Sequence, residues 1–300
     1  MVEIKTVAVV GGSGNLGIPI INQLLKDGFA VTALKRPDSK STFPSAVKVV
    51  TADYSSVDSV AAVFKGIDAV VSVVGQGPAA ACQNVLVDAA VAAGVKRFLP
   101  SDYGCPLANP NVAALPVFKS KLAIHKQLQE ATSKGLTYTL VCNGPFLDWG
   151  VQNRFVLDLS EANPRIYDGG DNVFSTTTLA GIAQGVSGTL KHYEETKNRF
   201  VYIKSTDQSQ NGLLAIAKKL APEKKWSQTD VSTVEVEKAS NASLAKGEIN
   251  QMVMYGYLFR AIFGKGDFGA KWSKEQDDSE LLGVTQISED DIAAFIKPLL

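Results

Sequence analysis

The sequence has few cysteines and few histidines. Its three cysteines, Cys82, Cys105 and Cys142, are scattered, and no two of them form a C-x-x-C pair. This distribution indicates reduced thiols in a cytoplasmic protein. The two histidines, His125 and His192, have no metal-ligand spacing around them, so we expect no metal site.

The sequence also lacks net charge and long apolar runs. Its 30 Lys and Arg residues balance 30 Asp and Glu residues, which argues against nucleic acid or an anionic membrane surface as a partner. The apolar stretch 85–99 is interrupted by Asp88, Lys96 and Arg97 and is therefore no membrane span. The first ten residues carry charges and no signal-peptide cleavage pattern. We expect a small molecule as the partner.

What the sequence does have is a regular alternation of apolar strands and helices. The strands are rich in Val, Ala and Leu with few polar positions, as in a parallel sheet that is covered on both faces. Strands are predicted at 6–11, 30–34, 47–52, 68–75, 97–101 and 138–143, and helices at 17–27, 57–65, 80–94 and 117–133. This order predicts an α/β fold with a Rossmann-type doubly wound parallel sheet.

Three glycines close the first predicted strand at G-x-x-G-x-x-G spacing, and a helical pattern follows at once. Such a turn aims backbone N–H groups and the positive end of the helix dipole at one point, which suits a pyrophosphate. Gly11 allows the tight turn, Gly14 the approach of the phosphate, and Gly17 close helix packing. The pattern predicts a dinucleotide loop, with a glycine turn that binds no ligand as the alternative. The loop also contains Ser13, Asn15 and Leu16.

The end of the second strand predicts the cofactor. NAD sites usually have Asp or Glu there, about 20 residues after the glycines, to bind the ribose hydroxyls. Lys35 and Arg36 occupy that place here, and a guanidinium pairs well with a 2′-phosphate. The pair favours NADPH over NADH. The alternative is a solvated basic pair close to Asp38.

Candidate binding residues follow the other strands, because ligands of such sheets bind at the carboxyl ends of the strands. We expect residues 53–54 to border the adenine and residues 143–146 to flank the nicotinamide. The candidates are Asp53, Tyr54, Gly75, Gln76, Ser101, Asn143, Pro145 and Phe146.

The alternation fades in the second half of the chain. A helix is expected after residue 176, a strand at 199–205, and further helices near 208–220, 233–246, 249–263 and 288–297. Helix-start signatures begin at Ser205, Ser232 and Ser288. We expect residues 1–152 to form the NADP-binding core and residues 153–300 a smaller, mainly helical substrate-binding cap, with about 176–205 returning to the core sheet. Phe146 and Trp149 are expected to line the substrate. Three aromatic residues of the cap either do the same or fill the core: Tyr255, Tyr257 and Phe259.

Lys121 is the candidate catalytic residue. The Y-x-x-x-K string 193–197 is interpreted as a solvated helix end, and a G-x-S-x-G hydrolase motif is absent. At about 100° per residue, Lys121 shares a helix stripe with apolar side chains, while Lys119 and Lys126 face solvent. A lysine on that stripe either extends to solvent or is held in a pocket as a general acid or base. The apolar members of the stripe are Val117, Ile124 and Leu128.

The spacing of these residues links the chain to a known family. Ser101 follows the fifth strand and Lys121 takes the lysine place of short-chain dehydrogenases, while Val117 stands where their tyrosine would be. The sequence resembles the atypical short-chain dehydrogenases of the NmrA-like type. Within them it is similar to the isoflavone reductase-like group, which includes pinoresinol–lariciresinol and phenylcoumaran benzylic ether reductases. The similar stretches are VVGGSGNLG (9–17), VKRFLPSDYG (95–104), FKSKLAIHKQL (118–128) and YTLVCNGPF (138–146).

The resemblance implies a function for these residues. It implies that the three glycines hold NADPH, that Arg36 meets the 2′-phosphate, and that Lys121 lies by the cofactor as the catalytic lysine. The expected reaction is hydride transfer to an electron-poor carbon of a small aromatic or conjugated substrate, with the lysine as general acid or base. Tyr103 replaces a phenylalanine of the plant enzymes, so the resemblance does not imply a substrate. The alternative is a non-catalytic, NADP-binding redox sensor of the NmrA-like type.

Overall fold

The main structural feature is a seven-stranded parallel sheet. The computed structural model describes residues 2–75 and 82–300. The strands of this sheet are β1 (Thr6–Val10), β2 (Ala30–Lys35), β3 (Lys48–Thr51), β4 (Ala69–Ser72), β5 (Arg97–Leu99), β6 (Thr137–Cys142) and β9 (Arg199–Tyr202). Their order is β3-β2-β1-β4-β5-β6-β9, and every neighbouring pair is parallel. This arrangement confirms the predicted Rossmann-type sheet.

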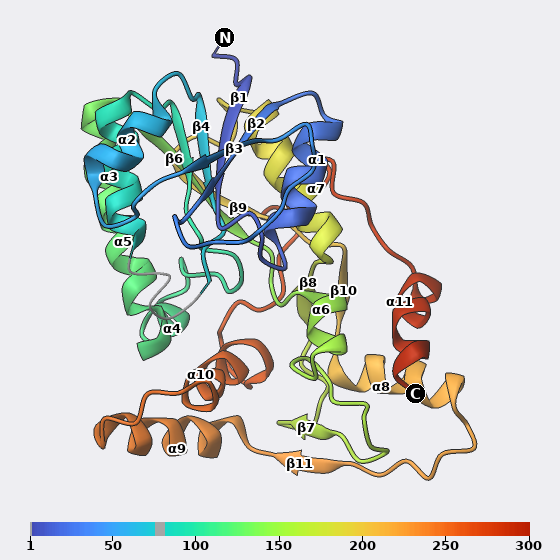
Figure 1. Ribbon diagram of the computed structural model, residues 1–300. Helices are drawn as coiled ribbons and strands as arrows, with labels where there is room; N and C mark the ends of the chain where they lie inside the picture. The colour runs from blue at the N-terminus through green and yellow to red at the C-terminus, as the bar shows by residue number, and fades with distance from the viewer. Residues whose placement is uncertain (1, 76–81) are drawn as a thin grey trace.

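Helices cover both faces of the sheet. They are α1 (Gly17–Lys26), α2 (Val57–Phe64), α3 (Gln83–Ala93), α5 (Lys119–Ala131) and α7 (Leu179–Lys191). Figure 1 shows α1 and α7 on one face and α2, α3 and α5 on the other. Strands that are covered on both sides need apolar residues at nearly every position, which explains their Val- and Ala-rich sequences. In α1, the stripe of Ile20, Ile21 and Leu24 is fully buried against the sheet.

The order of the strands reverses at β1. β2 and β3 lie on one side of β1, and β4, β5, β6 and β9 lie on the other. Ligands of open α/β sheets bind at such a reversal, beyond the carboxyl ends of the strands. Val10 ends β1 opposite Leu34 of β2 and Ser72 of β4. The glycine loop, the basic pair and the loop after β4 therefore leave the sheet at one edge.

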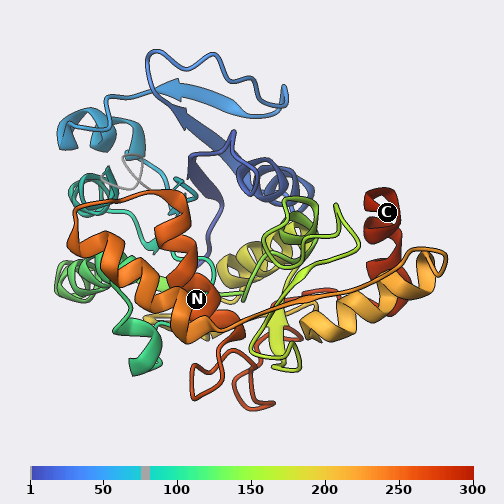
Figure 2. The ribbon, with the colours of Figure 1, turned by 90° about the horizontal axis from the view of Figure 1, so that it is seen from below.

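The remaining elements form a smaller, mainly helical part beyond this edge of the sheet (Figure 1). Its helices are α6 (Leu147–Gln152), α8 (Gln210–Leu220), α9 (Thr233–Ala245), α10 (Gln251–Phe263) and α11 (Glu289–Ile296). Two small sheets pair β8 (Phe174–Thr176) with β10 (Thr206–Gln208) and β7 (Arg165–Tyr167) with β11 (Thr229–Val231). Viewed from below, the α9–α10 hairpin and α8 lie on opposite sides of this part (Figure 2). No helix among the described residues combines the length and apolar character of a membrane span.

Helix α10 connects this part to the helix that carries Lys121. It packs on the turn Pro116–Phe118, which directly precedes α5 and follows the short helix α4 (Pro110–Ala113). Within α10, Tyr257 is fully buried and its hydroxyl is hydrogen-bonded. Phe259 is also buried and packs on another ring of the same apolar cluster. These two aromatic residues therefore fill the core.

Two of the three predicted helix starts are confirmed. Ser232 caps α9, and Ser288 caps α11 in a reciprocal capping box with Asp291. The start predicted at Ser205 is wrong. Residues 206–208 form β10 instead, and Ser209 caps α8.

The Y-x-x-x-K string is not a solvated helix end, because Tyr193 is buried and its ring packs on the buried guanidinium of Arg97. The guanidinium of Arg97, a fully buried side chain of β5, lies 4.2 Å from the centre of the Tyr193 ring. It donates to the Tyr193 carbonyl at 2.6 Å. It also donates to the hydroxyls of Thr137, Thr139 and Thr196. This string therefore belongs to a structural network at the amino-terminal end of β6.

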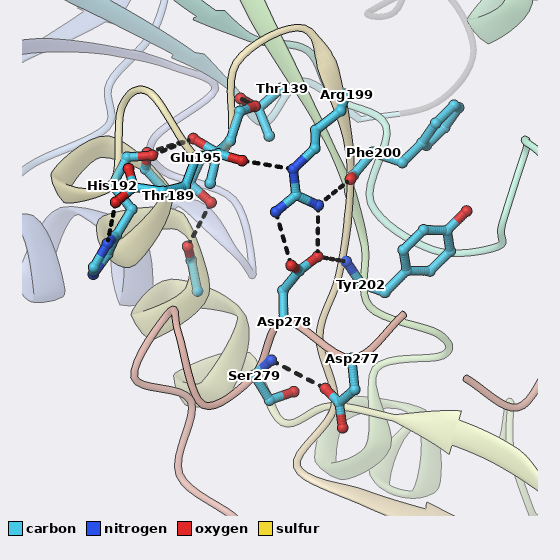
Figure 3. A network of polar contacts seen from close by, with 12 residues as sticks. Thr139, Thr189, His192, Glu195, Arg199, Phe200, Tyr202, Asp277, Asp278 and Ser279 are labelled. Carbon is cyan, nitrogen blue, oxygen red and sulfur yellow. Dashed lines mark hydrogen bonds and ion pairs between the residues drawn. The ribbon is translucent and has the colours of Figure 1, made fainter. Parts of the chain in front are cut away.

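The chain returns from the helical part to the free edge of β9 (Figure 3). Asp277 forms a parallel bridge with Tyr202. The carboxylate of Asp278 accepts two hydrogen bonds from the guanidinium of Arg199, at 2.8 and 3.0 Å, and a third from the Tyr202 N–H at 3.0 Å. Unpaired strand edges are prone to pair with other chains. Residues 277–279 cover part of this edge.

Candidate active site

Two of the three motif glycines, Gly11 and Gly17, are required by the packing of the chain itself. Gly11 has a φ of +83°, and a Cβ atom there would lie 2.7 Å from the carbonyl oxygen of Val73. A Cβ atom at Gly17 would lie 2.5 Å from the backbone of Gly12. Gly14 is different, because the nearest atom to its Cβ position is a carbonyl oxygen at 3.4 Å. Packing within the chain does not explain a glycine at position 14.

The rest of this loop is open to solvent at the start of α1. Ser13, Gly14 and Asn15 are exposed, while Leu16 is buried beneath them. The helix begins without a side-chain cap. The N–H groups of Gly17 and Ile18 already donate to the Gly14 carbonyl. The positive end of the helix dipole and the exposed loop before it are the features that suit a pyrophosphate here.

The two basic residues at the end of β2 differ in their surroundings. The amine of Lys35 donates to the carbonyl of Ser39 at 3.2 Å. The Arg36 side chain is 65% exposed, and its Nε lies 3.8 Å from the carboxylate of Asp38. A pair this long and exposed contributes little to stability. Arg36 therefore has the more available cation.

Residues 53 and 54 border the same end of β2. The hydroxyl of Tyr54 donates to the Leu34 carbonyl at 2.8 Å. Burial raises the pKa of Tyr54, and the charge of nearby Arg36 opposes this rise. Asp53 is exposed, and hydrogen bonds from Ser55 lower the pKa of its carboxyl group. Tyr54 and Arg36 thus lie together at the strand end.

Ser101 ties the ends of β4 and β5 together. Its hydroxyl donates to the Val74 carbonyl at 2.7 Å, and its N–H donates to the side chain of Gln83 at 2.7 Å. Gly75 is exposed, and nothing in the described chain lies within 4 Å of its Cβ position. Gln76 lies outside the described residues.

The backbone of the loop after β6 is hydrogen-bonded by Thr176, the last residue of β8, and by Thr177, which follows it. Asn143 is fully buried, and its carbonyl accepts the Thr177 hydroxyl at 2.7 Å. The Pro145 carbonyl accepts the Thr176 hydroxyl at 2.7 Å. Phe146 is half-buried and lies edge-on to Trp149, with ring centres 6.4 Å apart. The backbone of this predicted nicotinamide loop is therefore well held.

Lys121 is bound to the loop that follows β5. Its amine donates to the carbonyl of Asp102 at 2.6 Å and to that of Tyr103 at 3.3 Å. The side chain is half-buried, whereas Lys119 and Lys126 are exposed. Of the two alternatives for this lysine, the amine is held by the chain rather than extended to solvent.

Asp102 and His125 form a buried pair that the sequence analysis missed. The side chains are 2% and 9% exposed, and His125 Nε2 lies 2.9 Å from Asp102 Oδ1, off the line of a hydrogen bond. His125 follows Lys121 by four residues and so lies on the same side of α5. That spacing was a usable signal, because it places an ionisable ring one turn from the candidate lysine.

Unpartnered polar atoms gather at this edge of the sheet. Most buried polar side-chain atoms in proteins have a hydrogen-bond partner, so a group of exceptions is informative. Those found in the described part of the chain all lie at the carboxyl ends of β4, β5 and β6 or on the adjoining turn of α5. They are Ser72 Oγ, Asp102 Oδ2, Tyr103 Oη, His125 Nε2 and Asn143 Oδ1. This clustering is typical of a site that binds a polar ligand.

A separate cavity of about 520 Å³ is lined by none of the described candidate residues. Its walls include Asn109 from the loop after β5, Tyr202 from β9, and Lys271 and Trp272. Among residues 2–75 and 82–300, no three His, Cys, Asp or Glu side chains are grouped as a metal site. The strand ends with Lys121 are therefore the main candidate active site.

Comparison with known proteins agrees with this geometry. The model of the NmrA-like family matches residues 3–281. Oxidoreductase aprR of Aspergillus flavus is 33% identical over 295 residues, covering 97% of this chain and 98% of that protein. Oxidoreductase poxI of Penicillium oxalicum is 33% identical over 306 residues, covering 96% of this chain and 92% of that protein.

Solved structures share the fold. AtPrR2 with NADP⁺ and (+)-pinoresinol has a TM-score of 0.82 and 22% identity, over 100% of both chains. The leucoanthocyanidin reductase–NADPH complex of Vitis vinifera has a TM-score of 0.79 and 21% identity, over 97% of this chain and 99% of that one. The family match spans most of the chain, includes every candidate residue and confirms the resemblance of the motifs. The chain belongs to the NmrA-like family.

Proposed function

We propose that this chain is an NADPH-dependent reductase that transfers hydride to an electron-poor carbon of a small aromatic or conjugated substrate. The observation that carries the proposal is the position of Lys121, whose amine lies 2.6 Å from the Asp102 carbonyl beside a group of unpartnered buried polar atoms. The oxidoreductase names of its fungal relatives and the pinoresinol bound to AtPrR2 support the reaction and substrate class.

The residues at the sheet edge fit NADPH. The open loop Ser13–Asn15 at the start of α1 would hold the pyrophosphate, with Gly14 leaving room for it. The exposed cation of Arg36 would meet the 2′-phosphate. When bound, NADPH supplies the hydride. The other residues proposed to bind it are Gly11, Leu16, Gly17, Asp53, Tyr54, Gly75, Gln76, Ser101, Lys121, Asn143, Pro145 and Phe146.

Lys121 would act as the general acid. A lysine ammonium has three N–H donors, and the carbonyls of Asp102 and Tyr103 accept two of them. The third N–H is left to donate to an oxygen of the substrate or to a water molecule. The two carbonyls would hold the amine in place while its proton moves to the reduced substrate.

The proposal is tested by following NADPH consumption with a panel of enones, isoflavonoids and benzylic ethers that includes (+)-pinoresinol. We expect at least one compound to oxidise NADPH in proportion to enzyme, and Lys121→Ala to suppress this turnover. If NADPH binds and no compound consumes it, the result favours the redox-sensor alternative.

A further inference from the structure

One residue of the loop after β5 is contacted twice from helix α5. The amine of Lys121 meets the backbone carbonyl of Asp102 at 2.6 Å, and one turn later His125 Nε2 meets its carboxylate at 2.9 Å. Both contacts arise from a four-residue step along the helix. Lys121 and His125 therefore both contact Asp102, and a shift of Asp102 would alter both contacts.

His125 is the side chain that lies against the buried carboxylate of Asp102. An ionised carboxyl group that is taken out of water without a partner is strongly unfavourable. Without His125, this carboxyl group would either draw in water or rotate toward another donor. Because its carbonyl belongs to the same residue, either response disturbs the acceptor that holds Lys121.

The other titratable groups around the pair are neutral at ordinary pH. Burial raises the pKa of Tyr103 on the loop and that of Cys142 at the end of β6. It raises the pKa of Cys105 to about 12 and that of Tyr202 on β9 to about 12. From β9, Phe200 presents an apolar ring edge-on to His125, with centres 5.6 Å apart. The remaining ionisable side chains at this point are Asp102, His125 and Lys121, since Lys119 and Lys126 on the same helix face solvent.

We propose that His125 is a positioning residue, which acts through Asp102 to fix the loop carbonyls that hold the amine of Lys121. The inference deepens the proposed function and rests on it for its effect on turnover. The contacts themselves do not depend on the identity of the substrate, so they are measurable without one.

The test follows the Lys121 ammonium by NMR of isotope-labelled lysine, in the full chain with NADP⁺ added. A hydrogen-bonded ammonium exchanges its protons slowly with water, and Lys121→Ala identifies its signal. The variants are His125→Phe, which keeps a ring against Phe200, and Asp102→Asn, which keeps both backbone carbonyls. The double variant, with both substitutions, completes a double-mutant cycle.

The chain offers a matched control in its other histidine. His192 lies 3.5 Å from Glu195 at the carboxyl end of α7 (Figure 3). His192→Phe removes the same kind of contact from a half-exposed position. It should leave the Lys121 signal and the turnover unchanged.

We expect His125→Phe and Asp102→Asn each to speed proton exchange at Lys121 about tenfold, the factor that corresponds to one lost hydrogen bond. The double variant should match the single ones, because both act through the same contact. With a substrate in hand, kcat should fall about 10- to 100-fold, with KM for NADPH unchanged. An unaltered Lys121 signal in both single variants, or losses that multiply in the double variant, would overturn the inference.

Different results would refute the catalytic role of Lys121 and the positioning role of His125. If Lys121→Ala leaves turnover intact, the lysine is not catalytic, yet a changed Lys121 signal in His125→Phe still supports the positioning contact. If His125→Phe does not fold, Asp102→Asn alone decides, because it changes one atom of the side chain and no backbone group.

Discussion

Gly17 packs so closely on Gly12 that a Cβ atom at position 17 would lie 2.5 Å from the Gly12 carbonyl. Gly14, three residues earlier, has no comparably close neighbour. The motif therefore contains glycines of two kinds. Those at 11 and 17 are needed to fold the turn, whereas the packing of the chain leaves room for a side chain at 14.

The first prediction separates these two kinds. Gly14→Val should stay folded and lose NADPH binding, because its side chain would occupy the space proposed for the pyrophosphate. Gly17→Ala should lower the melting temperature even without cofactor. Calorimetric titration and thermal unfolding of both variants check this. Normal NADPH affinity in folded Gly14→Val would place the cofactor elsewhere.

The second prediction concerns the choice of cofactor. Arg36→Ala should weaken NADPH binding by about 1.5–3 kcal/mol, the contribution of a hydrogen bond to a charged group, and leave NADH binding nearly unchanged. Lys40→Ala, which removes an equal charge from an exposed position nearby, is the control. Dissociation constants for both cofactors are the measurement. Equal losses for NADPH and NADH would rule out a contact to the 2′-phosphate.

The third prediction concerns proton transfer. Lys121→Ala should reduce turnover by about 10²–10⁴, the usual contribution of a general acid or base, while NADPH still binds. Lys121→Arg should restore little, because a guanidinium does not release its proton at ordinary pH. Lys119→Ala, which removes an exposed amine of the same helix, should have no effect. Full activity of Lys121→Ala on a true substrate would refute the assignment.

The fourth prediction concerns stability in acid. Burial favours the neutral form of Asp68, but hydrogen bonds from Lys96 and from the N–H groups of Lys5 and Thr6 outweigh it and lower its pKa to about 2. A carboxyl group with a lowered folded pKa stabilises the protein above its unfolded pKa and loses this effect as the pH falls toward the folded value. Asp68→Asn should reduce the free energy of unfolding at neutral pH by about 2 kcal/mol.

This difference between Asp68→Asn and wild type should shrink as the pH falls from about 4 to about 2. Urea unfolding across this range measures it, with exposed Glu223→Gln as the control. A difference that stays constant with pH would mean that the hydrogen bonds act through the shape of the side chain and not through its charge.

The fold could be predicted because its signals are local. The strands of the main sheet lie in segments rich in apolar residues, and Ser232 and Ser288 mark helix starts within four residues of sequence. The strands β7 and β11 could not be found in this way. Each has three residues, and they pair across more than sixty residues of intervening chain. Their pairing depends on how the helical part packs.

The same distinction applies to the candidate site. Lys121 was predictable from its helix stripe, although Val117 precedes α5 in a 3₁₀ turn that begins at Pro116. The role of Asp102 was not predictable, because it depends on the path of a loop with no regular structure. The sequence pattern around His125 excludes a metal site and predicts nothing else for it. Its position four residues after Lys121 is the signal that points to a role beside the lysine.

The contact of residues 277–279 with β9 bears on how such proteins can be recombined. A chimera that joins the first half of this chain to the second half of a relative would exchange β9 and the residues that cover it, as well as the helical part. The recipient sheet would then end in a foreign strand beside β6. The helical part would be easier to transplant as two inner segments, 147–176 and 209–263, that leave Arg199 and Asp278 with their native partner.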